Sequence, residues 1–250
     1  MYSLQKAGVL KRFSAYLCDI ILLFIIIVGV AALLSTVLDY DSYSEKLDEL
    51  SEKYQAEYGI DINKDYNSLT PEEKALYDAA DKAFGEDPEV AYNYQMMINL
   101  SVIIITFSTL LAYVILEFIV PLIFKNGQTL GKKVFGIGVM RVDGVKITTP
   151  ILFIRTILGK FTIETMLPVL MILMIYFGAI GIVGVIVTAL IVIFNIGLLI
   201  ATKTNSAIHD ALSQTVTVDM SSQLIFNSTE EMIEYKQRIH REEASKASYF

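Results

Sequence analysis

The first long apolar run of the chain predicts a membrane-spanning helix. Residues 13 to 38 read FSAYLCDIILLFIIIVGVAALLSTVL, and Asp19 is the only charged residue among them. About 20 apolar residues are enough for a helix to cross the hydrocarbon core of a bilayer. A charge inside such a helix costs on the order of 3 kcal/mol on insertion scales and usually faces a bundle interior or a wet cavity. Asp19 is therefore a candidate functional residue.

Two further apolar blocks complete the predicted membrane region. The second block runs from Met96 to Phe124 and carries Glu117 near its end. The third block, Thr162 to Ala201, has 40 residues, which at ~1.5 Å per residue is roughly twice the ~30 Å hydrocarbon thickness. We expect it to fold into two spans joined by a tight turn, so that the chain has four spans. The glycines that mark this turn are Gly178, Gly181 and Gly184.

The distribution of charge predicts the orientation of these spans. Residues 1 to 12 carry three basic residues and no acidic one. Residues 39 to 95 carry 16 acidic and 5 basic residues, whereas residues 125 to 160 carry 7 basic residues and one acidic one. Basic segments stay on the cytoplasmic side of a membrane. We therefore expect both termini and the basic loop inside and the acidic loop outside, which four spans satisfy.

Composition agrees with a membrane protein. Of the 250 residues, 54% are hydrophobic, and the mean hydropathy is +0.53, which is far too apolar for an average soluble domain. The single cysteine, Cys18, lies in the first span, so an intrachain disulfide is excluded. The first apolar run is about twice the length of a signal-peptide core and contains Asp19, so we expect it to remain as an anchor.

The acidic loop has the composition of helices. Residues 70 to 73, Thr-Pro-Glu-Glu, form a good helix start, with a capping threonine, a proline in the first turn and acids at the positive end of the helix dipole. The density of acids could suggest calcium, but the D-x-[DN]-x-[DN]-G pattern is absent. We therefore interpret the loop as a solvated acidic helical hairpin.

The basic loop predicts a small β-structure followed by an interfacial helix. Residues 134–142 have an alternating pattern that predicts a β-strand. Asp143-Gly144 then gives a strong hairpin signal, and 145–148 would form the second strand. The strand-like segment 215–218 could join as a third strand. Residues 151–161 predict a short amphipathic helix whose basic side faces lipid phosphates. Its basic residues are Arg155 and Lys160.

Two remaining segments point to no nucleic-acid or nucleotide chemistry. Gly127 to Lys133 reads GQTLGKK, which is one residue short of a phosphate loop between its glycines and has no Ser or Thr after the first lysine. We reject nucleotide binding there and expect the glycines to allow tight turns. Ser228 to Glu231 predicts the start of a mixed-charge cytoplasmic helix.

The predicted fold class is an all-α membrane protein, a four-helix transmembrane bundle with a small cytoplasmic β-hairpin cap and an extracellular helical loop. The predicted regions are 1–38 (cytoplasmic N-terminus and first span), 39–95 (acidic extracellular loop), 96–124 (second span), 125–161 (basic hairpin and interfacial helix), 162–202 (third and fourth spans) and 203–250 (cytoplasmic tail).

Four short elements in order resemble the RDD family of bacterial membrane proteins. They are Lys11 to Asp19, Gly127 to Val142 with Asp143-Gly144, Arg155, and His209-Asp210 followed by Thr215-Val216. The family is named for one arginine and two aspartates, which by motif fall on Arg12, Asp19 and Asp210. The resemblance implies a location in the bacterial plasma membrane. It also implies involvement in transport, since some members have been linked to cation/proton exchange.

Residue counts place three polar side chains at a similar depth. Asp19 lies seven residues, ~10 Å, inward from Arg12. Glu117 and Asn195 each lie eight residues, ~12 Å, inward from a flanking lysine. Two carboxylates and an amide would suit a monovalent cation or a proton. We therefore name Asp19, Glu117 and Asn195 as a candidate ion or proton site, with Tyr113, Arg155 and His209 as supporting residues.

A purely structural interpretation stays open beside this one. Arg12 and Asp19 fall on one helical stripe, so Arg12 could pair with Asp19 or with Asp210 and fasten the helix ends. His209 could be a polar interfacial residue or a proton relay, and Asn195 could make an interhelical hydrogen bond.

Two classes of function are therefore expected. One is a cation/proton transporter or a subunit of one, for which we expect a homo-oligomer or a partner membrane protein because four spans leave little room for a pathway. The other is a membrane interaction or assembly protein whose acidic loop binds partners. The sequence shows no Ser-His-Asp order and no metal-ligand spacing, so we expect neither an enzyme nor a metal or cofactor. The expected partners are membrane lipids and a monovalent cation or proton.

Overall fold

Four long apolar helices dominate the computed structural model, which describes residues 4–61, 64–202 and 206–247. These helices are long and apolar enough to cross a membrane, and they confirm the four apolar segments that hydropathy predicts. They run over Val9–Val37, Pro88–Phe124, Thr149–Tyr176 and Ile182–Ala201. The chain divides into two compact units, Met1–Val28 with Thr109–Phe250 and Gly29–Ser108. We call them the core unit and the acidic unit.

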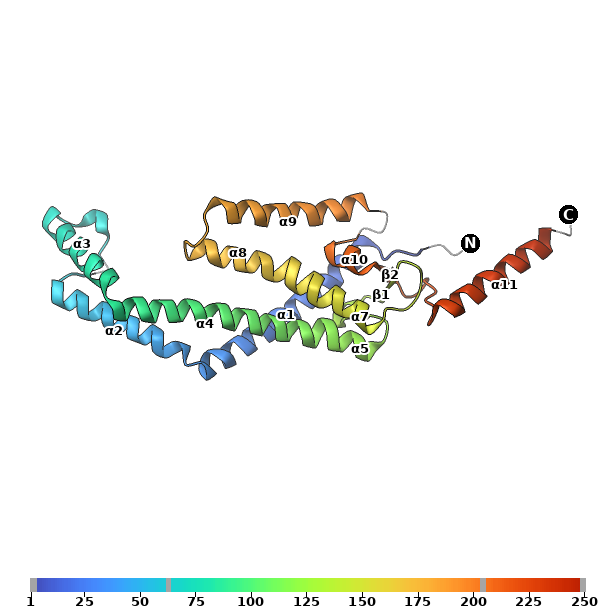
Figure 1. Cartoon of the computed structure of the whole chain (residues 1–250), viewed down its shortest axis with the longest axis horizontal. Helices are drawn as coiled ribbons and strands as arrows, with labels where there is room; N and C mark the ends of the chain where they lie inside the picture. The colour runs from blue at the N-terminus through green and yellow to red at the C-terminus, as the bar shows by residue number, and fades with distance from the viewer. Residues whose placement is uncertain (1–3, 62–63, 203–205, 248–250) are drawn as a thin grey trace. The chain divides into compact units, whose positions relative to one another are not determined.

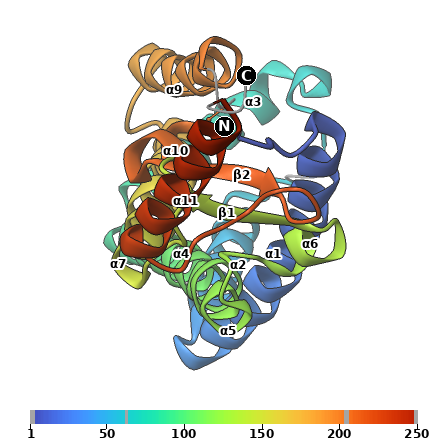
Figure 2. The same ribbon diagram turned by 90° about the vertical axis from the view of Figure 1, so that its right-hand side faces the viewer.

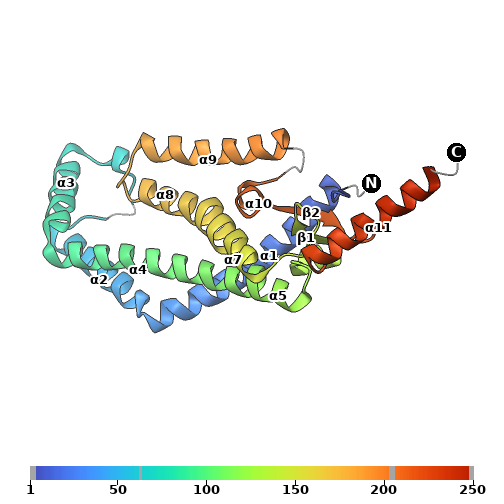
Figure 3. The same cartoon turned by 45° about the vertical axis from the view of Figure 1, so that its right-hand side comes forward.

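The long third apolar block does form two helices. Helix α8 ends at Tyr176, and the next helix begins at Ile182. Gly178 lies in the connection with a φ of 71°, a left-handed conformation that glycine adopts without steric cost. Figures 1 and 3 show α8 (Leu167–Tyr176) and α9 (Ile182–Ala201) side by side.

Two of the apolar helices contain π-helical segments, in which backbone hydrogen bonds join residues five apart. The Val120 N–H donates to the Ile115 carbonyl, and the N–H of Leu167 donates to Thr162. A proline follows each segment, Pro121 in the first helix and Pro168 in the second. Because proline has no N–H to donate four residues back, it favours a rearranged turn just before it. The segments are η2 (Val114–Ile119), between α4 (Pro88–Tyr113) and α5 (Val120–Phe124), and η3 (Ile154–Met166), between α7 (Thr149–Phe153) and α8.

A small antiparallel sheet lies beside the ends of these helices. Figure 2 shows strand β1 (Ile137–Arg141) beside β2 (Thr215–Asp219). The two strands pair with Val139 opposite Thr217. Alternating apolar side chains from both strands make a small buried cluster around Met140. The short helices of this region are α6 (Leu130–Val134), α10 (Ile208–Ser213) and α11 (Thr229–Ala247).

The expected hairpin and interfacial helix are not formed as predicted. The Asp143-Gly144 turn is present, but the described residues after it make only isolated bridges, because the Lys146 N–H donates to the Phe226 carbonyl. Among the described residues, 145–148 therefore do not form the expected second strand of the hairpin. The segment 215–218, expected as a third strand, does form a strand and pairs directly with β1 as β2. Residues 151–161 belong to one continuous helix from Thr149 to Tyr176.

The acidic unit contains two packed helices between the first two apolar ones. They are α2 (Tyr40–Tyr58) and α3 (Pro71–Glu86). The helix start predicted at Thr70 is present, and Thr70 and Glu73 form a capping box there. The Tyr54 ring meets Phe84 edge-to-face at 5.8 Å, and its hydroxyl donates to Asp87 at 2.9 Å.

Candidate functional site

A cavity of about 510 Å3 in the core unit has charged side chains from four of its elements on its wall. This volume lies in the range of small-molecule sites in proteins. The elements are α1 (Val9–Val37), α6, η3 and α10, and α9 adds an amide and apolar side chains. The charged wall residues are Arg12, Asp19, Lys132, Arg155, Lys160, Glu164 and Asp210.

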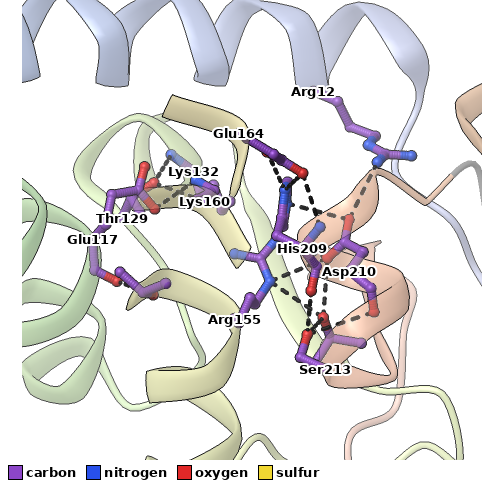
Figure 4. Close-up of polar contacts among 12 residues, drawn as sticks. Arg12, Glu117, Thr129, Lys132, Arg155, Lys160, Glu164, His209, Asp210 and Ser213 are labelled. Carbon is purple, nitrogen blue, oxygen red and sulfur yellow. Dashed lines mark hydrogen bonds and ion pairs between the residues drawn. The ribbon is translucent and has the colours of Figure 1, made fainter. Parts of the chain in front are cut away.

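Asp210 is the centre of the first of three polar clusters (Figure 4). It is 1% exposed, and its Oδ1 accepts from Arg155 Nη2 at 2.8 Å and from Arg155 Nε at 3.1 Å. The Thr215 hydroxyl donates to the same oxygen at 3.0 Å, and Arg12 Nη2 lies 3.8 Å from Oδ2. Burial alone would raise the pKa of Asp210, but the charges of Arg155 and its neighbours hold that pKa well below its usual range.

His209 joins this cluster to Glu164. The His209 backbone N–H donates to Glu164 Oε1 at 2.8 Å, and Nδ1 of its ring lies 2.8 Å from Oε2. Its Nε2 lies 3.6 Å from Asp210. Burial lowers the pKa of His209 and outweighs the opposite effect of Asp210. The neutral ring is therefore favoured, and it fastens α10 against η3.

Glu117 and Lys160 form the second cluster, between the two π-helical segments. Lys160 Nζ donates to Glu117 Oε2 at 2.6 Å, and their side chains are 11% and 3% exposed. The Thr156 hydroxyl donates to the Glu117 backbone carbonyl at 2.9 Å. That carbonyl is the one left without an α-helical donor by Pro121, four residues on. The rearranged helix therefore creates the contact that joins it to η3.

Asp19 belongs to the third cluster, where its donors carry no charge. The Thr129 hydroxyl donates to Oδ2, and the Gly131 N–H donates to Oδ1 at 2.8 Å. Lys132 Nζ donates to the Thr129 oxygen at 3.3 Å. Asp19 is 7% exposed and Lys132 is 8% exposed. A hydroxyl thus links a buried carboxylate to a buried ammonium group.

The residues of the candidate ion site have different partners in the structure. Glu117 is bound by Lys160, whereas Asp19 is bound by Thr129 and Gly131. Asp19 and Asn195 both line the cavity, and the buried Oδ1 of Asn195 has no hydrogen-bond partner among the described residues. Tyr113 shares a hydrogen bond of 2.7 Å with the Thr165 hydroxyl.

Arg12 was expected to pair with either Asp19 or Asp210, and the structure places it near Asp210. Arg12 lies near Asp210, 3.8 Å from its carboxylate, while the described hydrogen bonds of Asp19 go to other groups. Arg155 is the main partner of Asp210.

The lipid-facing role expected for Arg155 and Lys160 is wrong. Their residues are 2% and 9% exposed, and each is paired with a buried carboxylate. The reason is the winding of η3. Arg155 and Lys160 are five residues apart in the sequence. In an α-helix their side chains would point about 140° apart, whereas in the wider π-helical winding they lie close to one face.

The sequence analysis did not predict the roles of Glu164 and Thr129 or the burial of Lys132. The Thr-x-Gly-Lys run after Gln128 is the local signal that could have indicated Thr129 and Lys132.

These features define a class: a helical membrane protein with buried ion pairs and a cavity that has charged side chains on its wall. The model of the RDD family matches residues 6–214, so the chain belongs to the RDD family. No curated protein and no solved structure matches the chain.

Proposed function

We propose that this protein exchanges a monovalent cation for protons across the bacterial plasma membrane, alone or as a subunit of a transporter. The observation that carries the proposal is the cavity, whose lining includes both Asp19 and Asn195, and the buried Oδ1 of Asn195 has no hydrogen-bond partner among the described residues. Ionisable groups within spans are costly, and they mark ion pathways in many membrane proteins. No enzymatic activity is part of this proposal.

Asp19 is the carboxylate best suited to a cation. Asp210 is neutralised by Arg155, and Glu117 is neutralised by Lys160. Asp19 accepts hydrogen bonds from a hydroxyl and a backbone amide, and within the described residues it has no ion pair within 4.0 Å. The cation site of the proposal therefore consists of Asp19 and Asn195, with Glu117 outside it.

Flux measurements test this proposal. In proteoliposomes of the purified chain, a gradient of sodium, potassium or lithium ions should drive proton movement in the opposite direction. Asp19→Asn should abolish it, because the amide cannot supply the negative charge. The matched control Asp48→Asn alters an exposed acid of the acidic unit and should leave flux unchanged. Full flux in Asp19→Asn, or none in the wild type with any of the three ions, would overturn the proposal.

An interaction or assembly protein is the second candidate. The observation in its favour is that two of the buried carboxylates, Asp210 and Glu117, are each paired with a buried cation, as expected for a structural core. The acidic unit would then be the surface that binds a partner. A wild-type protein without flux, whose pull-down of a membrane partner depends on the acidic unit, would support this candidate.

We also propose that both termini are cytoplasmic and that the acidic unit is extracellular. Single cysteines in a Cys18→Ser background test this arrangement. Cysteines at Val134 and His240, which are exposed positions, should react with an impermeant maleimide only after the membrane is opened. A cysteine at Tyr66 should react in intact cells. Labelling at position 240 from outside would contradict the four-span arrangement.

A further inference from the structure

Lys132 is the cationic group of the cavity wall that lacks a carboxylate within ion-pair distance among the described residues. Its Nζ donates to the Thr129 hydroxyl at 3.3 Å, and that hydroxyl donates onward to Asp19. The other cations of the wall each lie within 4.0 Å of a carboxylate. Lys132 and Asp19 are therefore linked through the same Thr129 hydroxyl, and the negative charges of Glu117 and Asp19 both act on Lys132.

We propose that the ammonium of Lys132 and a bound monovalent cation are alternative counter-charges for Asp19, so that each cation that binds displaces one proton from Lys132. The inference rests on the proposed function and names the group that couples the two ions. Both groups line the same cavity, so a cation and a released proton share one route to solvent.

The exchange balances in charge and in atoms. Before binding, Lys132 carries three protons on Nζ, and Asp19 is ionised. When the cation binds at Asp19, one N–H bond of Lys132 breaks, its electron pair stays on nitrogen, and the proton leaves with cavity water. The site thus keeps the same net charge while one cation replaces one proton. Asp19 needs no protonation in this cycle.

The surroundings of Lys132 lower the pKa of its ammonium group, so that it can release a proton near neutral pH. Burial and the charge of Lys160 lower the pKa of Lys132 to about 8, while Glu117 and Asp19 oppose the shift and Arg155 adds to it. Burial is the largest of these causes. A bound cation adds a further positive charge and lowers the pKa again. The other titratable groups on the cavity wall are Arg12, Tyr16, Glu164, His209 and Asp210.

Sodium binding as a function of pH tests the coupling. The affinity of the purified full chain for sodium ions is measured by titration calorimetry from about pH 6 to about pH 9, in two buffers of different ionisation enthalpy. If one proton leaves per ion, the apparent Kd should fall about tenfold per pH unit below the pKa of Lys132 and level off above it. Proton release should be close to one per sodium ion at low pH.

Variants at Lys132 separate this inference from the proposed function. Lys132→Gln should bind sodium with a Kd that no longer changes with pH, and Lys132→Arg should bind it weakly at every pH. Lys133→Gln, at the exposed neighbouring lysine, is the matched control and should behave as the wild type. Unchanged pH dependence in Lys132→Gln would overturn the inference alone. Absence of binding in the wild type would overturn the proposed function with it.

A measurement on the wild type covers the case in which Lys132→Gln does not fold. Acetic anhydride reacts with neutral amines, so mass spectrometry can compare acetylation of Lys132 with that of Lys133 near pH 8. Sodium ions should increase the ratio by lowering the fraction of protonated Lys132. A ratio that sodium leaves unchanged would overturn the inference.

Discussion

Replacing Arg155 by methionine should lower the free energy of unfolding by about 3–5 kcal/mol, because it leaves the buried carboxylate of Asp210 without its main partner. Both side chains are almost inaccessible, at 3% and 1% exposure. Arg12, at 3.8 Å from Asp210, is too distant to replace a hydrogen bond. Thermal unfolding in detergent should show a large decrease in Tm.

The matched control is an ion pair of similar geometry at the surface. Lys11 Nζ lies 2.6 Å from Asp219, but the Lys11 side chain is 49% exposed. Lys11→Met should therefore change stability by no more than about 1 kcal/mol. Equal decreases in Tm for the two variants would show that burial of the Arg155 pair has no special weight.

The effect of Arg155→Met should also depend on pH. In the wild type, the pKa of Asp210 is below its unfolded value of about 3.9, so its contribution is present above that value and is lost as pH falls further. In the variant, burial of Asp210 without the arginine raises the pKa of its carboxyl group. The cost of burying the unpaired carboxylate is therefore present above this raised pKa and is relieved as pH falls through it and the carboxyl group is protonated. The difference in Tm should therefore be largest near neutral pH and narrow towards about pH 4.

Hydropathy was sufficient to predict the four apolar helices. The orientation inferred from charge stays a prediction. Block length alone divided residues 162–201, and the break at Phe177 to Gly181 follows from it. These features depend on runs of neighbouring residues, so they can be read from the sequence without knowing which distant residues are in contact. Residue counts also placed Asp19 and Asn195 at a similar depth, and both line the cavity.

The partners of the charged residues could not be predicted in this way. Counting residues to place Glu117 assumes a regular α-helix, but η2 changes the winding at Glu117. Glu117 consequently binds Lys160. Asp19 is joined to Thr129 across 110 positions of sequence, a contact that depends on how closely α6 approaches α1. Neither fact follows from hydrophobic periodicity.

That close approach gives the second large effect. Gly131→Ala should destabilise the core unit, because the added Cβ would overlap the Ala15 backbone carbonyl and lie 2.9 Å from Asp19 Oδ1. A backbone carbonyl cannot rotate away as a side chain can, so α6 must move off α1. Overpacking costs about 1–3 kcal/mol, and the movement also lengthens the two hydrogen bonds to Asp19.

The position of the methyl group, and not the loss of a glycine, should determine this result. Gly197 lies in α9 with no atom within 4 Å of its ideal Cβ, so Gly197→Ala should leave Tm unchanged or raise it slightly, since alanine is favoured over glycine in helices by up to about 1 kcal/mol. Displacement of α6 should also separate Lys132 from Asp19 and weaken the pH dependence of sodium binding. A Gly131→Ala protein with wild-type Tm and wild-type pH dependence would show that the Asp19 site does not depend on contact between α6 and α1.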